Sequence, residues 1–425
     1  MKRRNFISAL AGGVMVGASA KGRAPVRVDR RKGSLKKLVV FFQRGGCDGL
    51  NEIIPVDPAE YALYQGLRPA IGLPLGSITN IPGSSFFGMH PGLNPLLPII
   101  QAGDLSIFHA VAYPNPDRSH FESQAFYETA VPGNGLLSGW LNRYLSNTSG
   151  PGLIRGLSIG YNIPQSVSGT IPVPVSSNFG EVNIEVDQAL DAGSADNFRT
   201  SVRDIYNLSA TPGNSTIYDT GQRIFDMVDS FQDRDLDDYV PENGAIYPNT
   251  GTGRQVAHAA QMLKDDSSFL GVEIVTIDQG GYDTHANQIP SGNQADTTSG
   301  QGRLLLEMAE SMAAFYTDMG PVRMADTLFL VVTEFGRRAY QNDSLGTDHG
   351  TGSVAMVMGG PVNGTIFNGG ANWPGLNNLL YDDDLDWVTD YRDIYAEILA
   401  QHFGVSAGTL STVIPGHTYS PLGFL

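Results

Sequence analysis

Acidic and histidine side chains that could bind a metal ion stand next to several apolar runs of this chain. Each of these side chains either follows an apolar run or precedes one. The apolar runs are rich in β-branched and aromatic residues, which is typical of strands. The residues are Asp48, Asp283, His285, Glu334, Asp348 and His349. Carboxylate oxygens and imidazole nitrogens together form ligand sets for zinc, manganese or magnesium. If the runs are strands of one open sheet, their ends meet at the edge where such folds bind ligands. The pattern therefore predicts a site for one or two divalent metal ions.

A hydroxyl group stands at the expected start of a helix, in the segment Arg118-Ser119-His120. Near a metal ion, Ser119 could act as a nucleophile. Arg118 or His120 could neutralise the oxygens of an anionic substrate, and Arg337 could serve in the same way. The ordinary alternative is that Ser119 only caps the helix.

Each metal-binding motif also has an ordinary alternative. Asp48 lies among glycines and is typical of a turn. Glu334 could pair with Arg337 across one turn of a helix. Asp348 and His349 could form a pair at the surface. The metal site is favoured because all the motifs lie at the ends of expected strands.

The elements that must position these residues alternate between strand and helix patterns. Strands are expected at Leu38–Phe42, Leu105–Phe108, Gly156–Ile159, Gly271–Ile277, Thr327–Val332 and Ser353–Met358. Helices are expected at Leu93–Gln101, Phe121–Thr129, Leu136–Leu145, Gln255–Leu263, Gln301–Met319 and Asp390–Phe403, with two more in Phe198–Phe231. This alternation predicts an α/β fold, a three-layer sandwich with a largely parallel central sheet. We expect a single domain over 36–425, with a cap or insertion near 164–252.

The first twenty residues have the layout of an export signal. Arg3 and Arg4 precede a short, glycine-broken apolar segment, Ala9–Val16, and Ala18–Ala20 offers a cleavage site. The paired arginines followed by Phe6 resemble a twin-arginine signal. An ordinary secretory signal with two arginines is the alternative. We expect removal of 1–20, a disordered lead-in over 21–35 and a periplasmic or secreted protein. No later apolar stretch is long enough to span a membrane.

The composition excludes some classes of function. The formal net charge is −16, and a chain this acidic is a poor ligand for nucleic acid, whose phosphates require Lys and Arg. An anionic substrate would need a local cation to overcome this field. The single cysteine, Cys47, excludes an internal disulfide and is expected to be a buried spectator.

The motifs together resemble the exported bacterial family of unknown function called DUF1501. They lie at 44–51, 90–91, 118–121, 280–285, 333–337, 346–350 and 389–392. This family resembles a branch of the alkaline phosphatase and sulfatase superfamily. The resemblance implies metal ligands at Asp48, Asp283, His285, Glu334, Asp348 and His349, with Ser119 as nucleophile. The superfamily normally has Asp-His where this chain has Glu334 and Phe335, which puts the metal site shared with Asp48 in question.

The resemblance implies an exported, metal-dependent hydrolase of phosphate or sulfate esters. Its substrate would be a small anionic ester or an envelope glycan. A sulfatase with a modified cysteine is disfavoured, because Cys47 follows the first strand rather than occupying the nucleophile turn. The alternative is a non-catalytic cell-envelope binding or assembly protein on the same fold with degenerate metal sites. The Glu334-Phe335 departure favours this alternative, whereas the joint presence of the other ligands favours the hydrolase. An oxidoreductase is not favoured, because no Gly-x-Gly-x-x-Gly motif follows the first strand.

Overall fold

The computed structural model describes residues 35–133, 138–182, 192–207, 215–232, 234–264, 270–360 and 362–425. The expected signal peptide and nearly all of the expected lead-in lie outside these residues. No helix among the described residues has the length and apolar character needed to cross a membrane.

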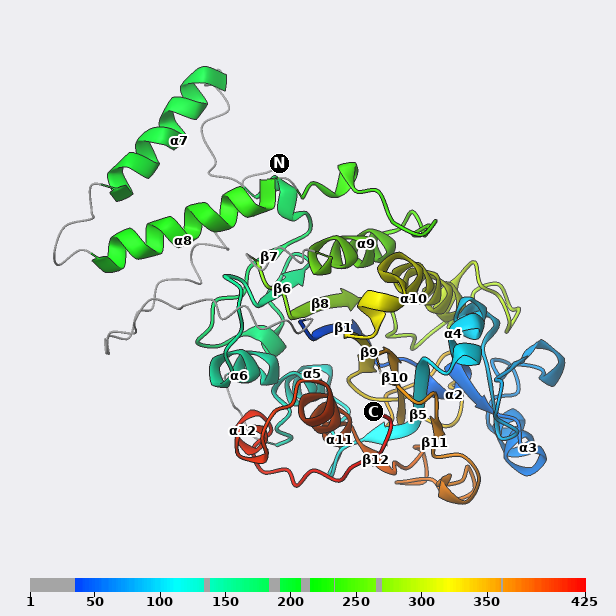
Figure 1. Ribbon diagram of the computed structural model, residues 1–425. Helices are drawn as coiled ribbons and strands as arrows, with labels where there is room; N and C mark the ends of the chain where they lie inside the picture. Colours follow the sequence, from blue (N-terminus) through cyan, green and yellow to red (C-terminus); the bar gives the residue numbers. More distant parts are fainter. Residues whose placement is uncertain are drawn as a thin grey trace.

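The described part of the chain contains a nine-stranded sheet with the order β11-β5-β10-β9-β1-β8-β6-β7, in which β12 also pairs with β5 (Figure 1). The strands are β1 (Lys37–Gln43), β5 (Leu105–Ala112), β6 (Gly156–Ile159), β7 (Val175–Ser176), β8 (Ile274–Gln279), β9 (Thr327–Thr333), β10 (Ser353–Gly359), β11 (Ile366–Phe367) and β12 (Thr389–Asp390). All pairs are parallel except those of β10, which runs antiparallel to both β9 and β5. The predicted α/β class with a largely parallel sheet is confirmed.

The orientation of β10 has a direct effect on the site. Parallel strands β1, β5, β8 and β9 all end at one edge of the sheet, and β10 begins at that edge because it runs in the opposite direction. The segments that follow four strands and the segment that precedes β10 therefore meet there. We call this edge the carboxyl edge.

Helices cover both faces of the sheet, because strand residues are apolar on both sides. Val39 and Phe41 of β1 belong to one core, while Leu38, Val40 and Phe42 belong to the other. Each large side chain buried in this way contributes roughly 1.5–3 kcal/mol. The first face is covered by α4 (Leu97–Ala102), α9 (Gly251–Leu263), α10 (Gly300–Met324) and the 3-10 helix η2 (Pro91–Leu96). The second is covered by α5 (His120–Thr129), α6 (Trp140–Asn147), α11 (Tyr391–Glu397), α12 (Ala407–Val413) and the π-helical turn η7 (Ile398–His402).

The expected strands and helices are present, with shifted ends. The helix expected at Leu136–Leu145 begins only at Trp140, because Gly139 is extended and precedes the first helical residue. The helix expected at Asp390–Phe403 is divided into α11 and η7, and its first residue closes the short strand β12.

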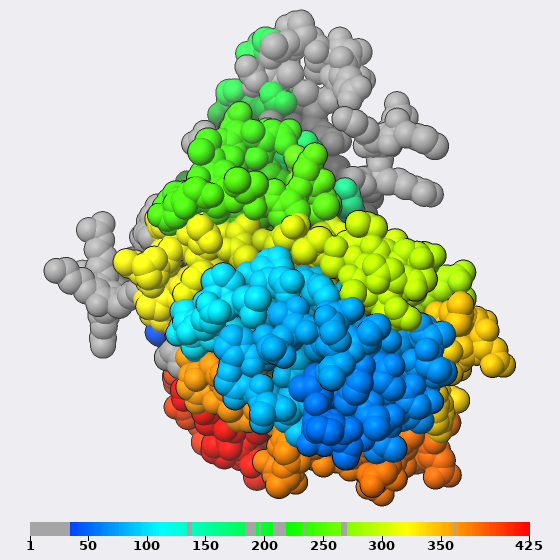
Figure 2. Space-filling view, turned by 90° about the vertical axis from the view of Figure 1, so that its right-hand side faces the viewer, coloured from blue at the N-terminus to red at the C-terminus, as the bar shows by residue number. Residues whose placement is uncertain are grey.

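A second, three-stranded sheet was not predicted from the sequence. It has the order β2-β4-β3 and consists of β2 (Ile53–Pro55), β3 (Thr79–Asn80) and β4 (Phe87–Met89). Nearby lie α2 (Gly49–Glu52), α3 (Pro58–Leu67) and the 3-10 turn η1 (Leu75–Ser77). Figure 2 shows this part of the chain, in blue, covering one side of the molecule.

The region near 164–252 contains little of the main sheet beyond β7. Two helices are present where two were expected, α7 (Ala192–Asn207) and α8 (Ser215–Gln232), and both extend beyond the β7 end of the sheet (Figure 1). The short turns η3 (Gln165–Val167), η4 (Phe179–Glu181) and η5 (Leu236–Asp238) belong to the same region, and η6 (Gly370–Asn372) follows β11. That this region acts as a cap remains a prediction.

Candidate metal centre

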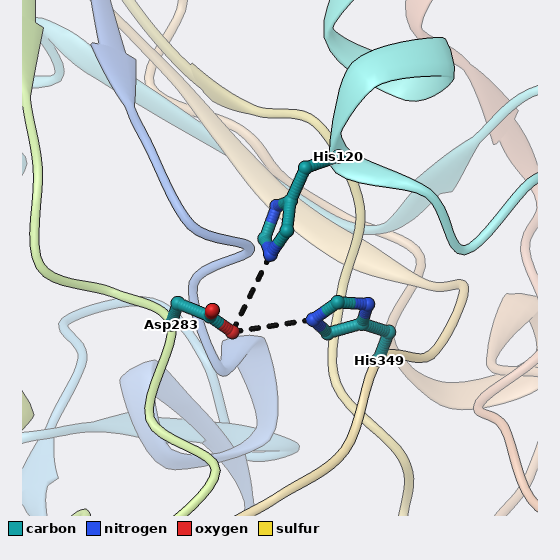
Figure 3. Close-up of side chains that lie close together, drawn as sticks. All are labelled: His120, Asp283 and His349. Atoms are coloured by element: carbon teal, nitrogen blue, oxygen red, sulfur yellow. Dashed lines mark hydrogen bonds and ion pairs between the residues drawn. The ribbon is translucent and has the colours of Figure 1, made fainter.

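Four side chains meet at the carboxyl edge, and we call them the histidine–aspartate cluster: His120, Asp283, His285 and His349. His120 is the first residue of α5, which follows β5, while Asp283 and His285 follow β8. His349 lies before β10 and forms an antiparallel bridge with Arg337, so the chain after β9 folds back along itself. Figure 3 shows His120 and His349 directed toward the Asp283 carboxylate.

The carboxylate of Asp283 lies at the centre of the cluster. Its Oδ1 atom is 3.4 Å from Nε2 of His120, 3.1 Å from Nε2 of His285 and 3.2 Å from Nε2 of His349. Partial burial raises the pKa of Asp283, but the hydrogen bond donated by Arg337 and the contacts with His349 and His285 outweigh that effect and lower the pKa to about 2. The carboxylate is therefore ionised near neutral pH.

Two of the imidazole rings are held by acceptors at their outer nitrogens. Nδ1 of His349 donates to the backbone oxygen of Arg118 at 2.7 Å, and a carbonyl can only accept. Nδ1 of His285 lies 2.9 Å from Oδ1 of Asp348, and this contact lowers the pKa of the Asp348 carboxyl. With a proton on each Nδ1, the neutral rings present the Nε2 lone pair to the cluster.

Glu334 holds the third ring. Its fully buried Oε1 accepts hydrogen bonds from His120 Nδ1 at 2.9 Å, Gln124 Nε2 at 2.9 Å and Gly45 N at 2.8 Å. Burial raises the pKa of Glu334, yet these donors lower it below its usual value. The hydrogen bond to Glu334 in turn raises the pKa of His120. Glu334 therefore fixes the orientation of the His120 ring, in the way that carboxylates commonly support metal-bound histidines. That Glu334 itself binds a metal ion stays a prediction.

The cluster has the chemistry of a divalent metal site. Nε2 of His285 and Nε2 of His349 are only 2.9 Å apart, and two lone pairs at this distance repel unless a proton or a cation lies between them. Nε2 of His120 is buried and makes no hydrogen bond within the described residues. Two imidazole nitrogens and one carboxylate oxygen, from His120, His349 and Asp283, lie within 4.8 Å of one another and form a set that zinc and other first-row divalent ions bind. His285 contacts Asp283 and His349 beside this set. The residues thus fit such an ion.

Arg337 is part of the scaffold of the site. Its buried guanidinium donates to Gly46 O at 2.7 Å, to Thr347 O at 2.8 Å and to Asp283 Oδ1 at 2.7 Å. These bonds tie together the segments that follow β1, β8 and β9. Because the group is enclosed and its donors are occupied, the expectation that it neutralises substrate oxygens is not supported.

Asp48 has partners other than those expected of a metal ligand. Its carboxylate is 1 % exposed, and Oδ2 accepts from Arg68 Nη1 at 2.6 Å and from Gln288 Nε2 at 2.6 Å. Oε1 of Gln288 in turn accepts from the hydroxyls of Thr284 and Thr347, which adjoin cluster residues. The buried guanidinium therefore supplies positive charge to Oδ2, and Asp48 supports the cluster loops through Gln288. The other oxygen, Oδ1, is buried and has no hydrogen-bond partner among the described residues, and that Asp48 binds a metal ion stays a prediction.

Ser119 and Arg118 stand directly before His120. Ser119 occupies the N-cap position of α5, and its side chain makes no capping hydrogen bond. The Arg118 guanidinium is held by the buried carboxylate of Asp384 at 2.8 Å and keeps 31 % of its side chain exposed. Both residues adjoin His120 in the chain, and the backbone oxygen of Arg118 contacts His349. Cys47 is buried, in agreement with the expectation for it.

No sequence pattern pointed to Arg68, Gln124 or Gln288, since each is a single polar residue outside the recognised motifs. The sequence analysis did identify position 335, where Phe335 stands in place of the histidine that the resemblance predicts. The ring of Phe335 packs against His120 and His349, with ring centroids 4.9 and 4.6 Å away. It forms an apolar wall there and supplies no ligand.

Comparison with solved structures finds distant likenesses only. One is a protein in the alkaline phosphatase superfamily from Vibrio parahaemolyticus, with 9% identity, a TM-score of 0.34, and coverage of 87% of this chain and 67% of that one. Another is the C-terminal periplasmic domain of EcEptC from Escherichia coli in complex with Zn, with 10% identity, a TM-score of 0.37, and coverage of 91% and 89%. A third is the alkaline phosphatase from the Antarctic bacterium TAB5, with 9% identity, a TM-score of 0.33, and coverage of 88% and 100%.

No curated protein matches the chain. The family model described as "Protein of unknown function (DUF1501)" matches residues 226–411. This segment includes Asp283, His285 and His349, together with Glu334 and Asp348. The match confirms, for this part of the chain, the resemblance to the DUF1501 family that its motifs indicate.

Proposed function

We propose that this protein is a metal-dependent hydrolase of phosphate or sulfate esters. The observation that carries the proposal is the convergence of three Nε2 atoms on Asp283 Oδ1, with an acceptor behind each ring. His120, Asp283 and His349 would hold one divalent ion, with His285 beside them. When bound, the ion supplies Lewis-acid polarisation of an ester oxygen and stabilises negative charge that develops there.

Ser119 is the proposed nucleophile. It directly precedes His120, and no capping hydrogen bond occupies its hydroxyl. In the first step its oxygen attacks phosphorus or sulfur, and the alcohol of the ester leaves with a proton. In the second step water releases the phosphate or sulfate from the serine. Splitting the reaction in this way replaces one difficult step by two easier ones.

Arg118 is proposed to bind the non-bridging oxygens of the substrate. Its guanidinium is fixed by Asp384 but remains partly exposed, so donors are available at a defined position. The chain as a whole repels anions because its net charge is −16. A local cation at this point is therefore required for a small anionic ester or an anionic envelope glycan to bind.

We predict that Ser119→Ala retains the metal ion but loses turnover by a factor on the order of 10³ or more. The serine contributes to the chemical step, whereas the proposed ligands are other residues. Metal content by mass spectrometry and hydrolysis of p-nitrophenyl phosphate and p-nitrophenyl sulfate would be measured for both proteins. Wild-type turnover in the variant would contradict the serine assignment and would transfer the attack to a water molecule.

A non-catalytic envelope protein is the second candidate. It is favoured by the ion pair between Arg68 and Oδ2 of Asp48, and by Phe335, which stands where a histidine ligand is expected. Both leave fewer ligands for a second metal ion. The same metal measurement separates the two candidates. Wild-type protein that takes up no zinc, manganese or magnesium would favour the second.

We also propose that the protein is exported to the periplasm or beyond by the twin-arginine route. The support is the sequence of residues 1–20, which precede the described part of the chain. Changing Arg3 and Arg4 together to lysine should retain a full-length precursor inside the cell, because this route requires the arginine pair. Cell fractionation and intact mass would show it. Unchanged export and cleavage would favour the ordinary secretory route instead.

A further inference from the structure

Tyr113, Asp117 and Ser123 are joined by three hydrogen bonds, and we call them the Tyr113 network. Asp117 N donates to the Tyr113 hydroxyl at 3.0 Å, and the Ser123 hydroxyl donates to Asp117 O at 2.8 Å. The two hydroxyl oxygens are 2.8 Å apart. Because a carbonyl can only accept, the Ser123 proton lies toward Asp117, and Tyr113 is the donor in the third bond. The three bonds therefore form a closed circuit in which each strengthens the next.

The Tyr113 side chain has a fixed place in the core. Tyr113 directly follows β5 and is 1% exposed. Its ring packs edge-on against the rings of Phe126, Tyr127 and Tyr391, with centroids 5.7, 6.0 and 5.9 Å away. Burial raises the pKa of the Tyr113 hydroxyl, so the hydroxyl keeps the proton that it donates. Ser123 is fully buried as well. The packed aromatic core thus anchors the network.

The network holds the backbone of Ser119 on both sides. Ser119 N donates to Oδ1 of Asp117 at 2.5 Å, and Ser119 O accepts from Ser123 N at 2.9 Å. The Ser119 side chain, in contrast, makes no capping hydrogen bond. Two members of the network therefore fix the backbone of this serine, while no cap takes up its hydroxyl.

Hydrogen bonds from Ser and Asp side chains to nearby backbone groups commonly serve only to close a turn. In this connection, however, both network members that bind a residue outside the circuit bind Ser119. Tyr113 is buried and cannot itself touch a substrate. Any effect of its hydroxyl on the site must therefore pass through Asp117 and Ser123 to the serine.

We propose that Tyr113 is a positioning residue for Ser119 and acts through Asp117 and Ser123. The inference rests on the proposed function, in which Ser119 is the nucleophile. A nucleophile attacks efficiently only from a defined place, and a displacement of about 1 Å can lower a rate by about 100-fold. The Tyr113 hydroxyl thus controls turnover from inside the core.

Tyr113→Phe tests the proposal, because it keeps the packed ring and removes only the hydroxyl. In the zinc-loaded protein, kcat for p-nitrophenyl phosphate or p-nitrophenyl sulfate should fall by about 10- to 100-fold, with KM within about 2-fold of the wild type. Zinc content should stay the same, since no proposed ligand changes. Amide hydrogen exchange gives a readout that requires no hydrolysis. The Ser119 amide keeps its acceptor in the variant, yet it should exchange about 10-fold faster or more.

Ser123→Ala interrupts the network at a second point and should lower kcat by a similar factor. The double variant should be no slower than either single variant, because the circuit acts as a unit. Tyr144→Phe is the matched control. Tyr144 is 4% exposed, and its hydroxyl donates to Oε2 of Glu273 at 2.8 Å, directly before β8 begins at the opposite edge of the sheet. This variant should lower the urea midpoint and leave kcat unchanged.

Wild-type kcat in folded Tyr113→Phe, or wild-type exchange of its Ser119 amide, would overturn the proposal. An equal loss of kcat in Tyr144→Phe would do so as well, because any buried hydroxyl would then have the same effect. The proposed function fails separately. Wild-type protein that hydrolyses neither ester would remove the hydrolase, whereas faster Ser119 exchange in Tyr113→Phe would still show that the network holds this residue.

Discussion

Replacing His349 with alanine should lower the affinity of the purified protein for zinc by roughly 100-fold or more and abolish ester hydrolysis. His349 offers Nε2 to the cluster at 3.2 Å from Asp283 and is held by the Arg118 carbonyl on its other side. Its removal leaves an incomplete ligand set, and the remaining groups cannot close around the ion. Competition against a zinc indicator of known affinity would measure the loss, with hydrolysis followed in the same samples.

Glu334→Gln is the graded control for this experiment. It keeps every proposed ligand but weakens the acceptor behind His120, so zinc affinity should fall by only about 10- to 100-fold. If both variants bound zinc as the wild type does, the cluster would not be the metal site. If Glu334→Gln were the more damaging of the two, Glu334 itself would be a ligand.

Replacing Arg68 with methionine should reduce the free energy of unfolding by about 3–5 kcal/mol, because it leaves the buried Asp48 carboxylate without its counter-charge. The two side chains are 0% and 1% exposed, and the Arg68 guanidinium also donates to the backbone oxygens of Ala339 and Arg338. Urea denaturation of the metal-free protein, followed by tryptophan fluorescence, would measure the difference.

The double variant Arg68→Met with Asp48→Asn should recover part of this loss, since it removes the buried charge along with its partner. Arg303→Met is the surface control. Arg303 pairs with Glu307 one helical turn away and is half-exposed, so its loss should change stability by less than about 1 kcal/mol. An effect of that size for Arg68→Met would show that Asp48 is neutralised in another way, and would restore Asp48 as a candidate metal ligand.

The sequence predicted the main sheet well because its signals are local. A buried strand such as β1 is a continuous apolar run, and its bounds follow from that run within one residue. The antiparallel direction of β10 is not a local property, because its own residues are as apolar as those of a parallel strand. The small sheet was missed because its strands have two or three residues each, too few to show a period.

The site was predicted only in part, because sequence motifs are local signals and contacts between distant residues are not. Motifs identified the segments that reach the carboxyl edge, including the one that carries His120. They could not show that the His120 ring meets the Glu334 carboxylate, 214 positions away in sequence. This contact supports our proposal that His120 binds a metal ion rather than an anion. Nor could they show that Asp48 meets Arg68 at the end of α3, since an isolated arginine has no recognisable spacing.

Because β10 runs in the reverse direction, residues 334–352 form one continuous connection at the carboxyl edge. Because β9 and β10 are antiparallel neighbours, the chain passes from one to the other without a crossover helix. This one connection contains Glu334, Arg337, Asp348 and His349. An antiparallel bridge between Arg337 and His349 holds its two halves together. Both of its ends enter the same rigid sheet side by side. Side chains of this connection also contact Gly45, His120 and Asp283, which follow β1, β5 and β8. A change within it would therefore shift residues of the site that come from the other strands.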